Sequence, residues 1–215
     1  MDIRKKKIRD EVLTIEDKSI GSAIGPNVSL ERCTLSIKVP SKLIIFADPC
    51  DLVDCTIKVA CTFANCQWWG KVACLRCKFL GRYKGNDFGK RDIFRRDMFK
   101  AYGSIEDCDF SDAKLDLCRF FNTDMSRVKL PKWPNVTVLN PSGLIGTYEK
   151  VQWRGGMKTI VGVIADSPPG TDAITFFVPE IIKRHRCTEE DIRHAIKHFG
   201  NVVMWGQKTG QVRYS

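Results

Sequence analysis

Large apolar residues recur every five positions in one stretch of the chain, CDFSDAKLDLCRFFNTDMSRVKL, residues 108–130. They are Phe110, Leu115, Phe120, Met125 and Leu130, and a smaller residue stands two positions before each one: Cys108, Ala113, Cys118, Thr123 and Val128. A five-residue step turns by about 140° around an α-helix and changes face in a β-strand, so neither element buries this set on one side. A chain that turns a corner every five residues does bury it. The pattern therefore predicts stacked coils, each side of which points one small and one large side chain inward.

The position between each inward pair is charged throughout this stretch and is predicted to face outward: Asp109, Lys114, Arg119, Asp124 and Lys129. The same small and large spacing recurs upstream at Val28 with Leu30, Cys33 with Leu35, Cys50 with Leu52, Cys55 with Ile57, Cys61 with Phe63, Cys66 with Trp68 and Cys77 with Phe79. The phase slips between some of these pairs, for instance by the six residues from Cys55 to Cys61. We therefore expect some coils to be irregular.

These residues resemble the pentapeptide-repeat family, whose units carry a small residue, a polar residue, then Leu or Phe, then two variable residues. The resemblance covers about half of the chain and implies a right-handed quadrilateral β-helix. It implies no particular activity, because one fold hosts many functions. The expected fold is mainly β: a right-handed pentapeptide-repeat-like β-solenoid with an inserted short helix and a small C-terminal α+β subdomain.

The chain is expected to divide into an N-terminal cap at 1–20, a solenoid at 21–135 and a C-terminal subdomain at 136–215. An excursion at 81–104, GRYKGNDFGKRDIFRRDMFKAYGS, interrupts the solenoid and carries seven basic and three acidic residues. The five-residue phase would bury Arg91 and Arg96, whereas a helix displays the basic residues around an apolar stripe. One interpretation is a solvated amphipathic helix lying along the solenoid. The other is a partner-binding patch formed by Arg91, Arg95, Arg96, Phe99 and Lys100.

The C-terminal region predicts a helix within 157–166, a second from Pro179, and a third at 189–199 with Thr188 as its N-cap. A hairpin follows at 202–214. This order resembles a winged helix-turn-helix, although Arg186 stands where the turn usually has Gly, and Ile182 where the first helix usually has Ala. The resemblance implies a DNA-facing set of residues, and the other interpretation is a packed subdomain with no such role. The set is Arg193, His194, Lys197 and His198 on the last helix, with Lys208 and Arg213 on the wing.

Ten cysteines raise the question of metal or redox chemistry, and eight of them occupy the small inward position. Free cysteine packs as a small buried hydrophobe, which is what that position requires. The CxxC at Cys74 and Cys77 has no second cysteine pair with which to complete a zinc site. The chain also lacks an HExxH motif, a phosphate-binding glycine loop and a GxSxG motif. We therefore expect no metal, no cofactor, no small-molecule substrate and no enzymatic activity.

The formal net charge of +10 indicates the class of partner. Mimicry of DNA by an acidic surface is disfavoured, and an acidic protein is the expected partner, with nucleic acid as the alternative. Neither a membrane-spanning apolar run nor a signal peptide is evident, so a cytoplasmic location is expected. The predicted function is non-enzymatic macromolecule binding through a rigid solenoid face, as a protein-interaction module or an inhibitor or immunity-type regulator. The alternative is a DNA-binding regulator that uses the winged-helix-like region.

Overall fold

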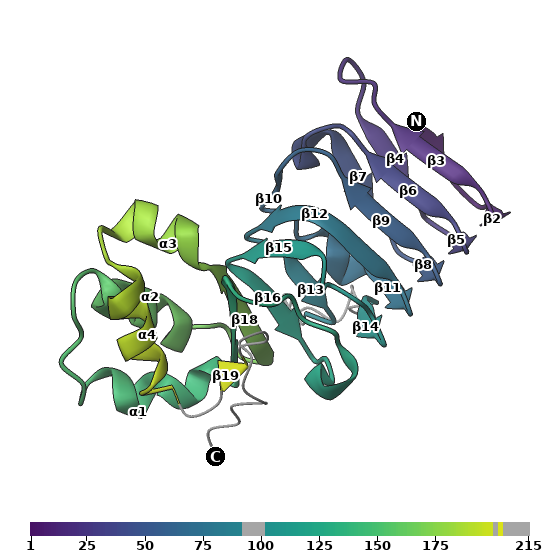
Figure 1. The fold of residues 1–215 in the computed structure, drawn as a ribbon. Helices are drawn as coiled ribbons and strands as arrows, with labels where there is room; N and C mark the ends of the chain where they lie inside the picture. Colours follow the sequence, from purple (N-terminus) through teal and green to yellow (C-terminus); the bar gives the residue numbers. More distant parts are fainter. Residues whose placement is uncertain (92–101, 200–201, 204–215) are drawn as a thin grey trace.

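The computed structural model describes residues 1–91, 102–199 and 202–203, and these form a parallel β-solenoid followed by an α+β unit. Figure 1 shows the strands of successive coils side by side, from the purple N-terminal coil towards the green C-terminal unit. The mainly β solenoid with a C-terminal α+β unit that the sequence predicts is thereby confirmed. The expected inserted helix falls on residues outside those described.

Three stacks of parallel strands form the walls of the solenoid. The first contains β2 (Lys7–Arg9), β5 (Val28–Glu31), β8 (Cys50–Val53), β11 (Val72–Leu75) and β14 (Ser104–Glu106). The second contains β3 (Val12–Ile15), β6 (Thr34–Ile37), β9 (Thr56–Val59) and β12 (Lys78–Lys84), and β12 also pairs with β10 (Phe63–Ala64) and β15 (Ala113–Asp116). The third contains β1 (Asp2–Ile3), β4 (Ser22–Ile24) and β7 (Ile44–Phe46). Short 3₁₀ turns lie between them: η1 (Ser41–Leu43), η2 (Trp68–Lys71) and η3 (Met125–Arg127).

The register of the first stack shows how long each coil is. Lys7 pairs with Ser29, Ser29 with Asp51 and Asp51 with Ala73, so partners from β2 to β11 keep a sequence separation of 22. Four sides of five residues would take about 20 residues, so steps of five alternate with longer ones. The step from Ile44 to Cys50, two buried residues, is six residues long. These longer sides are the physical origin of the phase slips in the sequence.

The predicted inward side chains form the core, with three exceptions. Cys61 is exposed because β9 ends at Val59 and the cysteine lies in the following bend. Trp68 points outward and the adjacent Trp69 is fully buried instead. Met125 begins η3 and is half-buried, although it still contacts the core. The five-residue assignment is therefore correct over most of the solenoid and wrong where a bend or a 3₁₀ turn replaces a strand.

Residues 1–20, which the sequence predicts as a cap, contain three strands, β1, β2 and β3, that pair in parallel with the strands of the next coil. Their cap-like property comes from two side chains. Lys6 precedes the Lys7–Ser29 pair, so it stands at the position that Val28 has in the next coil. Glu11 likewise stands at the position that Cys33 has in the next coil. Val28 and Cys33 are buried, whereas Lys6 and Glu11 are exposed. Charges in core columns make this end of the solenoid a poor surface for pairing with another sheet edge.

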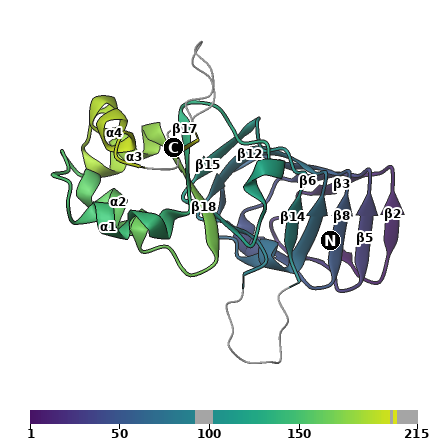
Figure 2. The same ribbon diagram turned by 90° about the horizontal axis from the view of Figure 1, so that it is seen from below.

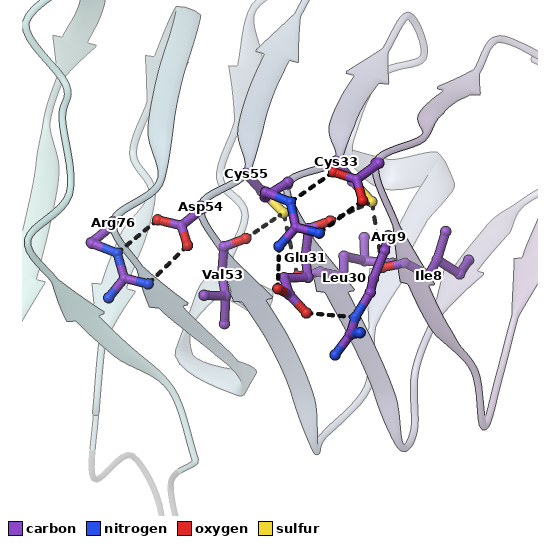
Figure 3. A network of polar contacts seen from close by, with 11 residues as sticks. Ile8, Arg9, Leu30, Glu31, Cys33, Val53, Asp54, Cys55 and Arg76 are labelled. Carbon is purple, nitrogen blue, oxygen red and sulfur yellow. Dashed lines mark hydrogen bonds and ion pairs between the residues drawn. The ribbon is translucent and has the colours of Figure 1, made fainter.

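One corner of the solenoid carries charges of alternating sign, a feature we call the corner ladder: Asp10, Arg32, Asp54, Arg76, Asp107 and Arg127. The first five have positive φ angles between 51° and 57° and mark the same turn in successive coils. Each of its arginines donates two hydrogen bonds to the aspartate of the preceding coil, as Arg76 does to Asp54 at 2.7 and 2.8 Å (Figure 3). Ion pairs between coils thus accompany a backbone conformation that Arg rarely adopts.

The corner ladder predicts a small acid-sensitive contribution to stability. The hydrogen bond from Arg76 holds the pKa of Asp54 below its usual value. A carboxyl whose pKa is lowered by folding stabilises the protein above its unfolded pKa near 4, and this contribution is lost as pH falls through the folded pKa. We expect Asp54→Asn to lower the Tm by about 1–3 °C at pH 7, and by less at pH 2. Thermal unfolding of Asp54→Asn, Arg76→Gln and the double variant checks this, and additive effects of the two substitutions would contradict the pairing.

A mixed sheet ends the solenoid and begins the C-terminal unit. Its strands, in spatial order, are β13 (Asp87–Gly89), β16 (Cys118–Phe121), β18 (Thr171–Phe177), β17 (Asn135–Leu139) and β19 (Val202–Val203). The solenoid strands β13 and β16 are parallel, whereas β18 runs antiparallel to β16 and so stops the stacking of parallel coils. Strand β17 lies in a segment that Pro131, Pro134 and Pro141 punctuate. Its NVTVL sequence is rich in β-branched residues, which favour a strand.

Helices cover this sheet and enclose a second hydrophobic core. They are η4 (Pro141–Leu144), α1 (Ile145–Tyr148), α2 (Met157–Ala165), α3 (Val178–His185) and α4 (Glu189–Ile196). The three helices predicted from the sequence are α2, α3 and α4, and Thr188 caps α4 through a capping box with Asp191. Of the predicted hairpin, only β19 lies within the described residues, and it pairs with β17. No helix of the described residues is long and apolar enough to cross a membrane.

Candidate protein-interaction site

The basic excursion is shorter than the sequence predicts. Strand β12 continues through Lys84, and Tyr83 and Phe88 are fully buried core residues, so residues 81–89 belong to the solenoid. The expected start at residue 81 is therefore wrong, because the sequence GRYKGNDF contains a strand on each side of a turn. Ala73 pairs with Ser104, whereas a coil of regular length would bring position 95 opposite Ala73, so this coil holds nine extra residues. The parallel pairing of β11 with β14 is kept across them.

The entry to the excursion is fixed by a buried charge. The Asp87 side chain, only 2% exposed, accepts two hydrogen bonds from Arg119 at 2.7 and 3.0 Å and also pairs with Arg91. Both guanidinium groups lie over the ring of Phe121, at 5.1 Å for Arg91 and 5.6 Å for Arg119. Arg91 is therefore held by the solenoid and serves as an anchor at the base of the excursion, rather than as a free contact residue.

The exit from the excursion is fixed by a close backbone contact. The Gly103 N–H donates to the Gly70 carbonyl at 2.9 Å, and a Cβ at residue 103 would lie 2.6 Å from that oxygen. Only glycine fits this approach. One residue earlier, the Tyr102 hydroxyl donates to Asp51 at 2.5 Å. Strands β13 and β14, which flank the excursion, lie against each other (Figure 1), so both of its ends are placed on one part of the solenoid.

The other residues predicted to bind a partner fall on the segment between these anchors. Arg95, Arg96, Phe99 and Lys100 lie outside the described residues, so their assignment stays a prediction. The same is true of Lys208 and Arg213 in the DNA-binding alternative. Figure 2, seen from below, shows the side of the solenoid on which β14 lies.

The C-terminal residues predicted to face DNA differ in their surroundings. Arg193 pairs with Glu189 at 2.8 Å, and its guanidinium lies 4.1 Å from the centre of the Trp133 ring. His194 and His198 approach each other with ring centres 5.1 Å apart. Only Lys197 and His198 are exposed, whereas Arg193 and His194 are partly covered. The structure therefore leaves two of these four side chains open to solvent and engages Arg193 within the subdomain.

Trp68 is a surface residue, although the five-residue spacing predicts it in the core. Its neighbour Trp69 is fully buried and donates from Nε1 to the Asn86 side-chain oxygen at 3.0 Å. Trp68 keeps 36% of its surface exposed, and the Lys71 ammonium lies 5.4 Å from the centre of its ring. The adjacent pair Trp68 and Trp69 could have indicated that one of them is at the surface, because neighbouring residues of an extended chain point to opposite sides. Both could not enter the core.

The cysteines are packing groups in the structure. Nine of the ten are buried, and all ten are free thiols. Several donate to a carbonyl of the preceding coil, as Cys55 does to Leu30 at 3.4 Å (Figure 3). Burial raises the pKa of Cys66 and of Cys118 to about 12, so both thiols are protonated at neutral pH and poor nucleophiles. Within the described residues no three His, Cys, Asp or Glu side chains are grouped to hold a metal ion.

Comparison with known proteins identified no relative of this chain. No family model, no curated protein and no solved structure matches it. Functional inference therefore depends on surface features of the chain itself, such as the anchored excursion and the basic end of α4.

Proposed function

We propose that the protein is a non-enzymatic binding module of the pentapeptide-repeat type, which uses its basic excursion to bind an acidic protein. One observation carries the proposal: one coil contains nine extra residues, yet its strands keep their parallel pairing. The ends of the extra segment are fixed by the contacts of Asp87 and of Gly103. A solenoid is a rigid support, and an anchored segment loses less freedom on binding than a loose one. Inhibition of the partner, in the manner of an immunity-type regulator, is the role that this arrangement serves.

The pentapeptide-repeat assignment is supported by the spacing and burial of the core residues. Between residues 108 and 130, each five-residue unit has a small inward residue, then an outward residue, then a large inward residue. The upstream coils depart from this spacing because partners in neighbouring coils are separated by 22 positions, which is not a multiple of five. A cytoplasmic location is part of the proposal and fits ten cysteines, all of which are free thiols.

The charge of the excursion supports an acidic partner. Residues 90–101 contain five basic and two acidic side chains, with four aromatic or large apolar residues between them, Ile93, Phe94, Met98 and Phe99. Arg91 is held by Asp87, and the other basic residues of the segment are Lys90, Arg95, Arg96 and Lys100. Arginine and aromatic residues are enriched at the centres of protein interfaces, where single arginines contribute about 2 kcal/mol or more.

The test is a titration with poly(L-glutamate) as a defined carboxylate-bearing chain. We expect the double variant Arg95→Ala, Arg96→Ala to bind it at least about tenfold more weakly than the wild type. The matched control is Lys18→Ala with Lys58→Ala, which removes the same charge from exposed lysines elsewhere on the solenoid. A clearly smaller loss in the control supports the excursion as the site. Equal losses in the two double variants, or no binding by the wild type, would reject it.

DNA binding by the C-terminal unit is the second candidate, and the exposure of Lys197 and His198 favours it. A titration with a short DNA duplex at two salt concentrations separates the two functions. Each neutralised phosphate contributes about −0.9 to the slope of log affinity against log salt concentration. If the C-terminal unit binds DNA, the double variant Arg193→Ala, Lys197→Ala should make this slope less steep by the contribution of about two phosphate contacts. We expect only weak binding that does not depend on sequence. A tight, sequence-selective complex lost in this variant would establish the alternative.

A further inference from the structure

Basic side chains gather on the outer face of the solenoid where β12 and β15 lie beside α3 (Figure 1). Two of them, Arg82 and Lys114, are direct partners in the parallel pairing of β12 with β15. Lys84 follows Arg82 by two residues along β12, so the three side chains point to the same face of the sheet. We infer that these three residues form a binding site for an anion that carries several linked phosphate groups. The inference goes beyond the proposed function and does not involve the excursion.

The carboxylates beside this site are already paired with guanidinium groups. Glu180, in the first turn of α3, lies 2.5 Å from Nη2 of Arg82. Asp116 of β15 accepts two hydrogen bonds from Nη2 of Arg184, at 2.8 and 2.9 Å. Both carboxylates are therefore balanced by arginines alone, without any contribution from the lysines around them.

Three lysines surround these two pairs and form no ion pair with any of the described residues: Lys84, Lys114 and Lys183. The pKa of Glu180 is lowered first by the hydrogen bond from Arg82. The positive charges of Lys84 and Lys183 lower it further, so both ammonium groups are near this carboxylate. Five basic side chains thus meet two acidic ones, which leaves an excess of three positive charges at this place.

This arrangement is unfavourable without a counter-ion. Arg82 and Lys114 stand on directly paired residues of strands about 4.8 Å apart, and like charges in such positions destabilise a sheet. Lys114 is exposed, and its Nζ is held 5.9 Å from the centre of the Phe177 ring. The Arg82 side chain keeps 36% of its surface exposed while it pairs with Glu180. Both cations are therefore open to a ligand, and an anion between them removes their repulsion.

Linked phosphates fit this excess of charge better than carboxylates do. A terminal phosphate group carries up to about two negative charges at neutral pH and three acceptor oxygens, so linked phosphates balance the site within a small volume. A guanidinium binds two phosphate oxygens at once, and a lysine ammonium binds phosphate as a point charge. A peptide supplies only one carboxylate per acidic residue. Inorganic triphosphate and the phosphate chain of a nucleotide share the required chemistry.

Titration with inorganic triphosphate, in buffer free of divalent cations, tests the site. We expect the wild type to bind triphosphate at least about tenfold more tightly than orthophosphate, and the double variant Lys84→Ala, Lys114→Ala to lose at least about tenfold in affinity for triphosphate. Lys84→Arg with Lys114→Arg keeps both charges and should retain binding. The matched control is Lys18→Ala with Lys150→Ala, which removes the same charge from exposed lysines elsewhere in the chain.

Three results would overturn the site: no binding of triphosphate by the wild type, equal affinities for triphosphate and orthophosphate, or equal losses in the two alanine double variants. A single-stranded oligonucleotide that binds more tightly than triphosphate through the same lysines would also overturn it, in favour of a nucleic acid. Adenosine triphosphate distinguishes the two sources of the anion. Tighter binding than triphosphate supports the site with a nucleotide as its ligand, and equal binding supports it with the phosphate chain alone. Thermal unfolding of each variant shows whether the loss of binding occurs in a folded protein.

Discussion

Replacing Trp69 by alanine is expected to lower the free energy of unfolding by about 3–5 kcal/mol. Its indole lies at the centre of an aromatic cluster and contacts the rings of Phe46, Phe63, Phe79 and Phe88 at centre-to-centre distances of 4.9 to 5.8 Å. The substitution leaves a cavity among these rings. It also leaves the side-chain oxygen of Asn86 buried without its donor, which adds to the cost.

Urea denaturation of Trp69→Ala and Trp68→Ala measures this effect with the neighbouring tryptophan as the matched control. Trp68 is partly exposed, so its substitution should cost less than about 1 kcal/mol. The slope of free energy against urea should be similar in both variants, since the unfolded surface is nearly the same. Comparable losses at the two positions would show that the inward and outward assignments of the doubled tryptophan are wrong.

The five-residue spacing was sufficient to predict the solenoid because each coil of such a fold contacts only its neighbours, so the buried positions repeat along the sequence. An inward residue within the solenoid contacts the same position of the neighbouring coils, as Ile57 lies between Leu35 and Phe79, so the repeating pattern describes its surroundings without knowledge of distant segments. The same reasoning predicted that the cysteines pack in the core, and nine of the ten are buried. It erred at Cys61 and Met125, where a bend or a 3₁₀ turn takes the place of a strand.

The corner ladder was also present in the sequence but at a different period. Asp10, Arg32, Asp54 and Arg76 alternate in sign with a sequence separation of 22. A search for five-residue repeats does not detect this separation, because it is not a multiple of five. The length of the coil, which only the strand register shows, is needed to recognise that these charges are neighbours.

The candidate site could be predicted only in part. Charge and the failure of the five-residue phase indicated an excursion, yet its start was placed nine residues before Lys90 because Tyr83 and Phe88 were not recognised as core residues. The role of Arg91 depends on its ion pair with the buried Asp87 and could not be read from a basic segment. The pairing of β17 with β18 was missed for another reason: β-branched residues favour a strand within a segment, but they do not show which distant segment it pairs with.

The junction between solenoid and C-terminal unit contains a second buried charge. Asp116 of β15 is only 1% exposed, and its two oxygens accept from Nη2 of Arg184 on α3 at 2.8 and 2.9 Å. The Phe177 N–H also approaches this carboxylate, at 3.4 Å. Burial raises the pKa of Asp116, and the positive charge of Arg184 opposes that rise. Arg184 thus keeps a buried carboxylate ionised where the two parts of the chain meet.

Arg184→Ala is accordingly expected to destabilise the protein by about 3 kcal/mol at pH 7, because it leaves the Asp116 charge buried without its partner. An acid whose pKa is raised by folding stabilises the protein most below its unfolded pKa, near 4, and this contribution is lost as pH rises through the folded pKa. The substitution raises the pKa of Asp116 further, so the destabilisation should be largest at neutral pH and shrink towards pH 4. Urea denaturation across this range measures it, with Lys183→Ala as the control that removes the same charge from an exposed position of α3. A loss that does not depend on pH, or an equal loss in Lys183→Ala, would contradict the role of Arg184 as the partner of a buried carboxylate.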